Sequence, residues 1–111
     1  MNNAVALTLM GGQLIAEIGC DLDHHGASGV REQVDRRIFE EQPQVLVLDF
    51  CSVGFMDSSG IAFIIGRAEL MRSTGGKTVL RGLSPGQHKL IRLSGIDRMQ
   101  GLTVDKTTDG K

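Results

Sequence analysis

Short apolar segments alternate with polar, glycine-containing segments along the whole chain, and their spacing predicts the secondary structure. Residues 4–9 and 13–18 are rich in apolar side chains, and Met10, Gly11 and Gly12 separate them. Paired glycines supply the positive φ angles that a tight turn between two strands requires. The pattern therefore predicts a β-hairpin at the start of the chain.

Three later segments have the periodicity or the start signals of helices. Apolar residues recur at steps of three and four over about 25–41, with charged residues on the other faces, which is typical of an amphipathic helix. A second helix is predicted over about 59–72. Its expected buried stripe consists of Ile61, Ile64, Ile65, Ala68 and Met71. A third helix is expected after Ser84-Pro85, because serine caps helices and proline is tolerated at the first helical position.

Between the helices, three more strands are predicted at 45–50, 77–81 and 101–104. The run at 45–50 is apolar on both faces, which favours a central, covered strand. The order β-β-α-β-α-β-α-β predicts one α/β domain with a mixed sheet of four to five strands, in which the opening hairpin is antiparallel and most other pairs are parallel. We expect this domain to span residues 1–111, with a polar, frayed tail at about 105–111.

Composition narrows the function. The 111 residues carry 12 Lys and Arg against 13 Asp and Glu, so the net charge is −1, and Trp and Tyr are absent. Nucleic-acid binders need excess basic charge or stacking aromatics, so direct nucleic-acid binding is not expected. No apolar run reaches the roughly 18 residues of a membrane span, and no signal peptide is recognisable, so a cytoplasmic domain is predicted. Cys20 and Cys51 have no C-x-x-C spacing and are expected to be reduced and mostly buried.

Two polar clusters follow strands that are predicted to be neighbours, one at 21–25 and one at 57–60. Ligand sites of open α/β sheets gather at the carboxyl ends of strands, so both clusters are expected on one rim. Asp23 is expected to cap the helix after it. The second cluster has two interpretations: a plain helix cap, or an exposed serine at a helix N-terminus, where a phosphate group is well accommodated.

Catalysis and metal binding find little support in these clusters. The second cluster matches neither G-x-S-x-G nor a P-loop, and no carboxylate pair with general acid and base roles is evident. His24 and His25 are adjacent and are poor joint metal ligands, so no metal site is predicted.

Phe63 lies off the predicted stripe of its helix and shares a face with Ser59, four residues earlier. Together with Met56 it could form an apolar patch beside the serines. Such a patch is either a partner-docking surface with a phosphorylatable rim, or a side chain packed under a neighbouring loop.

The motif Phe55-Met56-Asp57-Ser58-Ser59-Gly60-Ile61, preceded by VLVLDF, resembles the signature of anti-sigma-factor antagonists in the STAS-domain family. The similarity is greatest to the antagonists of sporulation in endospore-forming bacteria. The rest of the match consists of Leu22-Asp23-His24-His25, Gly66-Arg67, Gly75-Gly76, Leu83-Ser84-Pro85 and Leu93-Ser94-Gly95.

The resemblance implies a binding protein without enzymatic activity that switches partners. Unphosphorylated, it would bind an anti-sigma factor that is also a serine kinase and so free a sigma factor. The kinase would phosphorylate Ser58, helped by Asp23 beside it, and a serine phosphatase would restore the protein. The protein itself would be a monomer when free and need no cofactor, because ATP or ADP enters only through the kinase. The partner-binding residues would be Asp23, His24, Met56, Asp57, Ser59, Gly60 and Phe63.

Two departures from the family pattern and two alternatives stay open at this point. Cys20 stands where the family usually has glycine, and a C-terminal helix that is common in the family is expected to be shortened or missing. The first alternative is a STAS-type binding module in another signalling complex or in a lipid-transport complex. The second is an enzyme, such as a weak nucleotide-hydrolysing domain.

Overall fold

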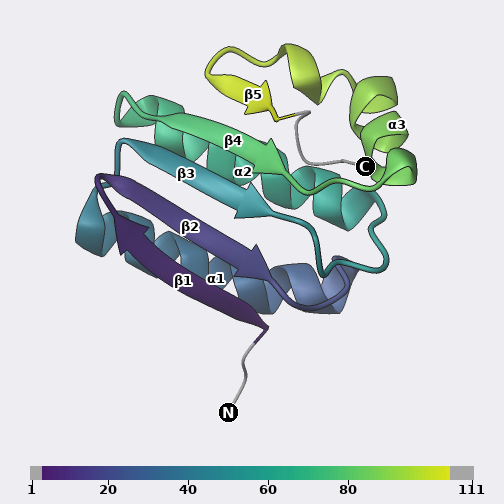
Figure 1. Ribbon diagram of the computed structural model, residues 1–111, viewed down its shortest axis with the longest axis horizontal. Coiled ribbons are helices and arrows are strands. Elements are labelled where there is room, and N and C mark those ends of the chain that lie inside the picture. The colour runs from purple at the N-terminus through teal and green to yellow at the C-terminus, as the bar shows by residue number, and fades with distance from the viewer. Residues whose placement is uncertain (1–3, 106–111) are drawn as a thin grey trace.

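Five strands and three α-helices alternate along the part of the chain that the computed structural model describes, residues 4–105 (Figure 1). A short 3-10 helix, η1, precedes the last strand. In chain order the elements are β1 (Val5–Met10), β2 (Gln13–Ile18), α1 (His24–Glu41), β3 (Val45–Asp49), α2 (Ser58–Ser73), β4 (Lys77–Arg81), α3 (Pro85–Ser94), η1 (Ile96–Arg98) and β5 (Leu102–Val104).

The strands lie in the sheet in the same order as in the sequence, β1-β2-β3-β4-β5. β1 and β2 are antiparallel, and every other neighbouring pair is parallel. Gly11 and Gly12 form the hairpin turn with φ angles of 60° and 81°, a backbone that side chains other than glycine rarely adopt. The predicted α/β class, the order of elements along the chain and the antiparallel hairpin are confirmed.

β3 occupies the centre of the sheet, as its apolar run predicted, but the expectation that it is covered on both faces is wrong, because α1 and α2 lie on one face only (Figure 1). Leu46 and Leu48 point into the main core and are fully buried. Val47, between them, points to the opposite face and is only 5% exposed.

Helices α1 and α2 cover the same face of the sheet (Figure 1). The stripe predicted for α1 is buried as expected, whereas the stripe predicted for α2 is partly wrong. Ile61 and Ile65 are only half-buried, and Phe63 and Arg67 are buried in their place. The reason is that α2 packs against both β4 and α1, so its buried arc is turned toward the neighbouring helix.

The ends of the third helix follow the predicted signals. Ser84 caps α3, and its side chain accepts a hydrogen bond from the backbone N–H of Gln87, whose side chain accepts one from the N–H of Ser84. Gly95 ends the helix with φ 82°. η1 was not predicted, because three residues are too few to show a period. Of the tail expected at about 105–111, only Asp105 is among the described residues, and the rest lies outside them.

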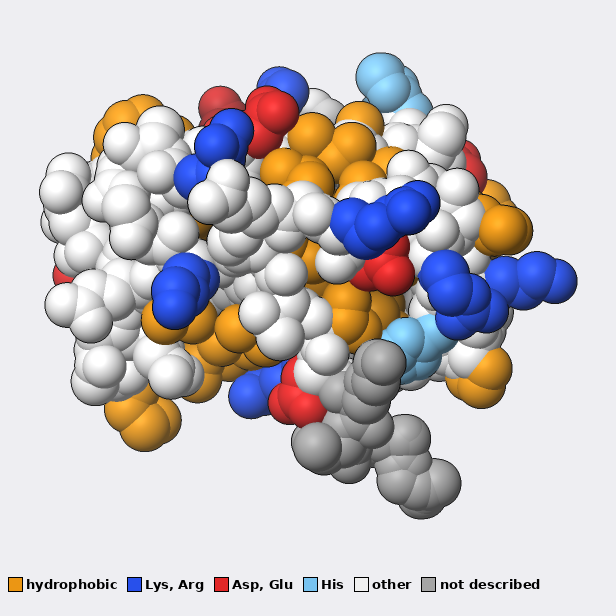
Figure 2. Space-filling model, turned by 90° about the horizontal axis from the view of Figure 1, so that it is seen from above, with side chains coloured by type: hydrophobic (Ala, Val, Ile, Leu, Met, Phe, Trp, Pro, Cys, Tyr) orange, Lys and Arg blue, Asp and Glu red, His pale blue; other side chains and the backbone are white. Residues whose placement is uncertain are grey.

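The surface is mixed in charge. On the face shown in Figure 2, Lys and Arg side chains are scattered among apolar and neutral ones, and some of them gather at the right. Within residues 4–105, no helix is long and apolar enough to cross a membrane.

Candidate functional site

The two predicted polar clusters lie side by side, because the strands that precede them, β2 and β3, are parallel neighbours. Their loops are joined beyond the strands by an isolated parallel bridge between Leu22 and Met56. The backbone N–H of Leu22 donates to the carbonyl of Phe55 over 2.8 Å, and the N–H of Asp57 donates to the carbonyl of Leu22 over 3.5 Å. The expectation of one shared rim is confirmed.

An aspartate follows each bridge residue and caps the helix after it. Asp23 caps α1 and accepts a 2.8 Å hydrogen bond from the N–H of Gly26. Asp57 caps α2 and accepts one of the same length from the N–H of Ser59. Both loops therefore have the same plan of bridge residue, aspartate cap and helix, which brings two carboxylates and two positive helix ends to one rim.

Ser58 and Ser59 are the first two residues of α2, but their surroundings differ. Ser58 is exposed, and no hydrogen bond to its hydroxyl is present within residues 4–105. Ser59 is half-buried and lines a cavity between α1 and α2. The Ser58 hydroxyl is therefore the more accessible of the two to a modifying enzyme.

Gly60 lets the bridge pack closely onto α2. A Cβ atom at this position would lie 2.8 Å from Met56 Sδ and 3.1 Å from Leu22 Cβ. The first of these distances is shorter than Cβ contacts in real structures. A glycine is thus required where the loop crosses the first turn of the helix.

The prediction that Met56 and Phe63 form an exposed apolar patch is wrong. Met56 is 9% exposed and Phe63 is 3% exposed, because the side chain of the first packs against Gly60 of α2 and the second faces α1. The large exposed apolar side chain of this rim is Phe55, 52% exposed, which the sequence reasoning missed. Alternation along an extended segment could have found it, because a buried Met56 turns its neighbour outward.

His24 and His25 occupy the first turn of α1 and are both exposed. His24 lines the same cavity as Ser59. In the part of the chain that the structure describes, no group of three metal-ligating side chains is close enough to hold an ion.

The cysteines differ from expectation in burial. Both thiols are free, but Cys20 is half-buried and Cys51 is exposed at the end of β3. Cys20 does not adopt positive φ, so its loop needs no glycine there. Gly26 faces this loop instead, and a Cβ on it would lie 3.3 Å from Cys20 Sγ.

Asp49 closes the carboxyl end of β3. It accepts hydrogen bonds of 2.9 Å from the backbone N–H of Cys51 and from Nε of Arg81, its neighbour on β4. Burial alone would raise the pKa of Asp49, but these donors outweigh it and lower the pKa below its usual value. The carboxylate of Asp49, as partner of the Cys51 thiol, raises the pKa of that thiol.

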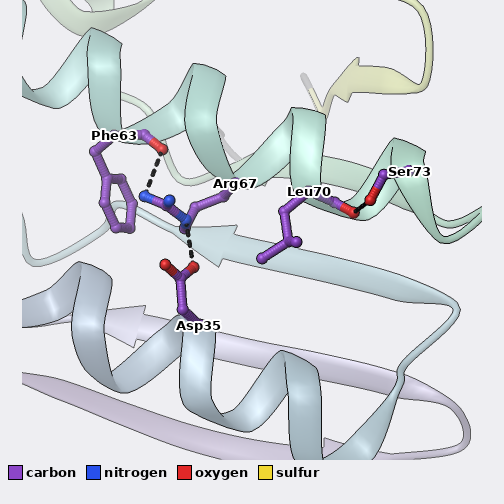
Figure 3. A network of polar contacts seen from close by, with 5 residues as sticks. All are labelled: Asp35, Phe63, Arg67, Leu70 and Ser73. Atoms are coloured by element: carbon purple, nitrogen blue, oxygen red, sulfur yellow. Dashed lines mark hydrogen bonds and ion pairs between the residues drawn. The ribbon is translucent and has the colours of Figure 1, made fainter.

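One buried ionic contact joins α1 to α2 and was not foreseen. Nε of Arg67 lies 2.7 Å from Oδ1 of Asp35, and Nη1 donates to the carbonyl of Phe63 over 3.3 Å (Figure 3). The Asp35 contact is an ion pair rather than an aligned hydrogen bond, because the angle between the groups is unfavourable. The guanidinium also lies 5.3 Å from the centre of the Phe63 ring. This cluster ties together the two helices whose N-termini form the rim.

Comparison with known proteins agrees with this fold. A model of the STAS domain matches residues 5–110. An anti-sigma F factor antagonist from Paenibacillus polymyxa is 35% identical over 96 residues, which cover 86% of this chain and 82% of the relative.

Two solved structures of the anti-sigma factor antagonist SpoIIAA have the same fold. Its unphosphorylated form has a TM-score of 0.73 at 24% identity, covering 95% of this chain and 90% of that one. The phosphorylated form, from Bacillus, has a TM-score of 0.71 at 25% identity, covering 94% and 93%.

Proposed function

Because the chain belongs to the STAS domain family, we propose that it is an anti-sigma-factor antagonist whose binding to an anti-sigma factor is switched off by phosphorylation of Ser58. The antagonists of this family act by binding rather than by catalysis. The observation that carries the proposal is the exposed Ser58 hydroxyl at the first position of α2, on a rim that two parallel loops hold together. The relatives' names, which refer to anti-sigma factors, supply the class of partner.

The rim presents chemistry that suits a kinase substrate. The Ser58 hydroxyl points to solvent, while Asp57 uses its carboxylate to cap the helix. Asp23 starts the neighbouring helix across the bridge. We propose that Asp23 and His24 contact the kinase, and that Phe55 adds the apolar contact that was expected from Met56 and Phe63.

Phosphorylation would change charge more than shape. A phosphate adds about −1.5 to −2 charges at pH 7, beside two carboxylates that are already on the rim. Helix N-termini bind anions favourably, so the fold would tolerate a phosphate group on Ser58. Solved structures of both the unphosphorylated and the phosphorylated forms of SpoIIAA have this fold, with TM-scores of 0.73 and 0.71 to this chain. The added charge would act on the partner by repulsion and by the cost of desolvation.

The proposal includes the surroundings of this switch. The anti-sigma factor would be the serine kinase, ATP or ADP would enter only with it, and a serine phosphatase would remove the phosphate. The antagonist would be a monomer when free and would work in the cytoplasm. Met56, Asp57, Ser59 and Gly60 would shape the contact surface, the buried ones by supporting it from below.

The experiment is phosphorylation by the cognate anti-sigma factor with ATP, followed by mapping of the phosphate by mass spectrometry. Phosphate is expected on Ser58 in wild type and in Ser59→Ala, the matched control. Ser58→Ala is expected to bind the anti-sigma factor and accept no phosphate. Phosphate on Ser59 in wild type, or unchanged binding after stoichiometric phosphorylation of Ser58, would contradict the proposal.

A further inference from the structure

A cavity of about 300 Å³ lies between the first halves of α1 and α2. Its cationic side chains are Arg31 and Arg67, and its other polar side chains are His24, Ser28 and Ser59. The remaining lining residues are apolar or glycine, and none carries a carboxylate. The walls therefore favour an anion.

Arg67 is a buried donor with capacity left over. Its side chain is only 9% exposed. Nε faces Asp35 and Nη1 donates to Phe63, whereas Nη2 has no hydrogen-bond partner among residues 4–105. Nη2 is not among the buried polar atoms that lack a partner, so it is accessible from the cavity and available to donate to a ligand.

Arg31 brings a second positive charge to the same space. It is exposed, and it has no ion-pair partner within the described part of the chain. Burial lowers the pKa of Arg67, and the charge of Arg31 lowers it further, against the opposing effect of Asp35. The two guanidiniums thus repel each other, and an anion between them would relieve that repulsion. Glu32 and Asp35 line a neighbouring hollow that shares both arginines, and they do not enter this cavity.

We propose that this cavity binds a small organic phosphate monoester, with its phosphate on Arg31 and Arg67 and its apolar body along Ala62 and Phe63. Guanidiniums recognise phosphate oxygens through paired, charge-assisted hydrogen bonds. The volume is within the range of small-molecule sites and exceeds what a phosphate ion alone would fill. The inference does not depend on phosphorylation of Ser58, because Ser58 does not line the cavity.

The test is to titrate the full chain with phenyl phosphate, without any kinase and at constant ionic strength, and to monitor binding by backbone amide NMR. Phenyl phosphate is expected to shift the amides of Ala62 and Gly66 along a saturating curve. Arg31→Gln is expected to weaken binding about tenfold or more, because a charge-assisted contact is lost. Arg36→Gln, which removes an exposed charge from the same helix outside the cavity, is the matched control and is expected to bind like wild type.

Three results would overturn the inference. The first is equal weakening by Arg31→Gln and Arg36→Gln, and the second is a non-saturating response. The third is equal affinity for phenyl phosphate and inorganic phosphate, which would show that the cavity recognises only the phosphate group and not the organic part of an ester. Ser58→Ala is expected to bind phenyl phosphate as wild type does, so failure here and failure of the proposed function are distinguishable.

Discussion

Leu22 and Met56 form a parallel bridge that continues the pairing of β2 with β3 beyond the last residues of both strands. The bridge aligns the two capping aspartates, which are the next residues in each loop. The rim is consequently an extension of the sheet, and the predictions below follow from how it is supported.

A negative charge at Ser58 is expected to abolish binding without unfolding the protein. In Ser58→Asp, the carboxylate lies at the positive end of α2, so the free energy of unfolding should stay level or rise by about 0.3–1 kcal/mol. Affinity for the anti-sigma factor should fall at least tenfold. Chemical denaturation followed by circular dichroism and calorimetric binding measure the two effects separately. A variant that binds weakly because it has unfolded would not support the switch.

Adding one methyl group at Gly60 is expected to disturb the rim. The methyl group of Gly60→Ala would push Met56 and Leu22 away from α2. The free energy of unfolding should fall by about 1–3 kcal/mol. The matched control is Gly66→Ala in the same helix, where a Cβ meets no atom within 4 Å. There, the higher helix propensity of alanine should stabilise the protein by about 0.5–1 kcal/mol. Thermal unfolding of the pair decides, and equal effects would show that packing at Gly60 is not tight.

Removing Asp35 from its ion pair with Arg67 is expected to destabilise the protein more than removing Arg67. Asp35→Asn leaves a buried guanidinium without its counter-charge and should cost about 2–3 kcal/mol, somewhat less than for a fully buried pair because 28% of the Asp35 side chain is exposed. Arg67→Met leaves Asp35 partly solvated and should cost less.

Glu41→Gln is the control for this pair, because it breaks the more exposed contact of 3.7 Å between Arg37 and Glu41. It should cost under about 0.5 kcal/mol. Denaturant unfolding of the three variants gives the comparison, and a cost for Glu41→Gln equal to that for Asp35→Asn would remove any special role for burial.

Asp49 is expected to make stability depend on acid pH. Its pKa is lowered in the folded protein from an ordinary value of 3.8, so its stabilising effect is complete above that value and is lost as the pH falls through the lowered pKa. The difference in unfolding free energy between wild type and Asp49→Asn should therefore be largest at pH 5–7 and shrink below about pH 4. Denaturation series at pH 7, 5 and 3 test this, with the exposed Asp97→Asn as a control for the loss of one carboxylate. A difference that grows toward low pH would have the wrong sign.

The order of elements and the rim could be read from the sequence, because each depends on local signals. Paired glycines, aspartate caps and the Ser84-Pro85 start act within a few residues. The placement of two polar clusters on one rim needed only the expectation that the strands before them are parallel neighbours.

The contacts between helices could not be read in the same way. Phe63 and Arg67 are buried because α2 turns part of its surface toward α1, and periodicity within one helix does not show which second neighbour it meets. Asp35 and Arg67 lie on different helices, so their contact depends on how the helices pack. One signal was available: Arg67 is four residues from both Phe63 and Met71, in an otherwise apolar row.

The bridge between Leu22 and Met56 also affects how long each state of the protein would last. Because backbone hydrogen bonds fix both loops to the sheet, we expect that the proposed switch needs no slow rearrangement of the rim. On the proposed function, the phosphate ester alone would distinguish the two states of the protein. The duration of each state would then equal the lifetime of a single covalent bond, set by the enzymes that make and hydrolyse it.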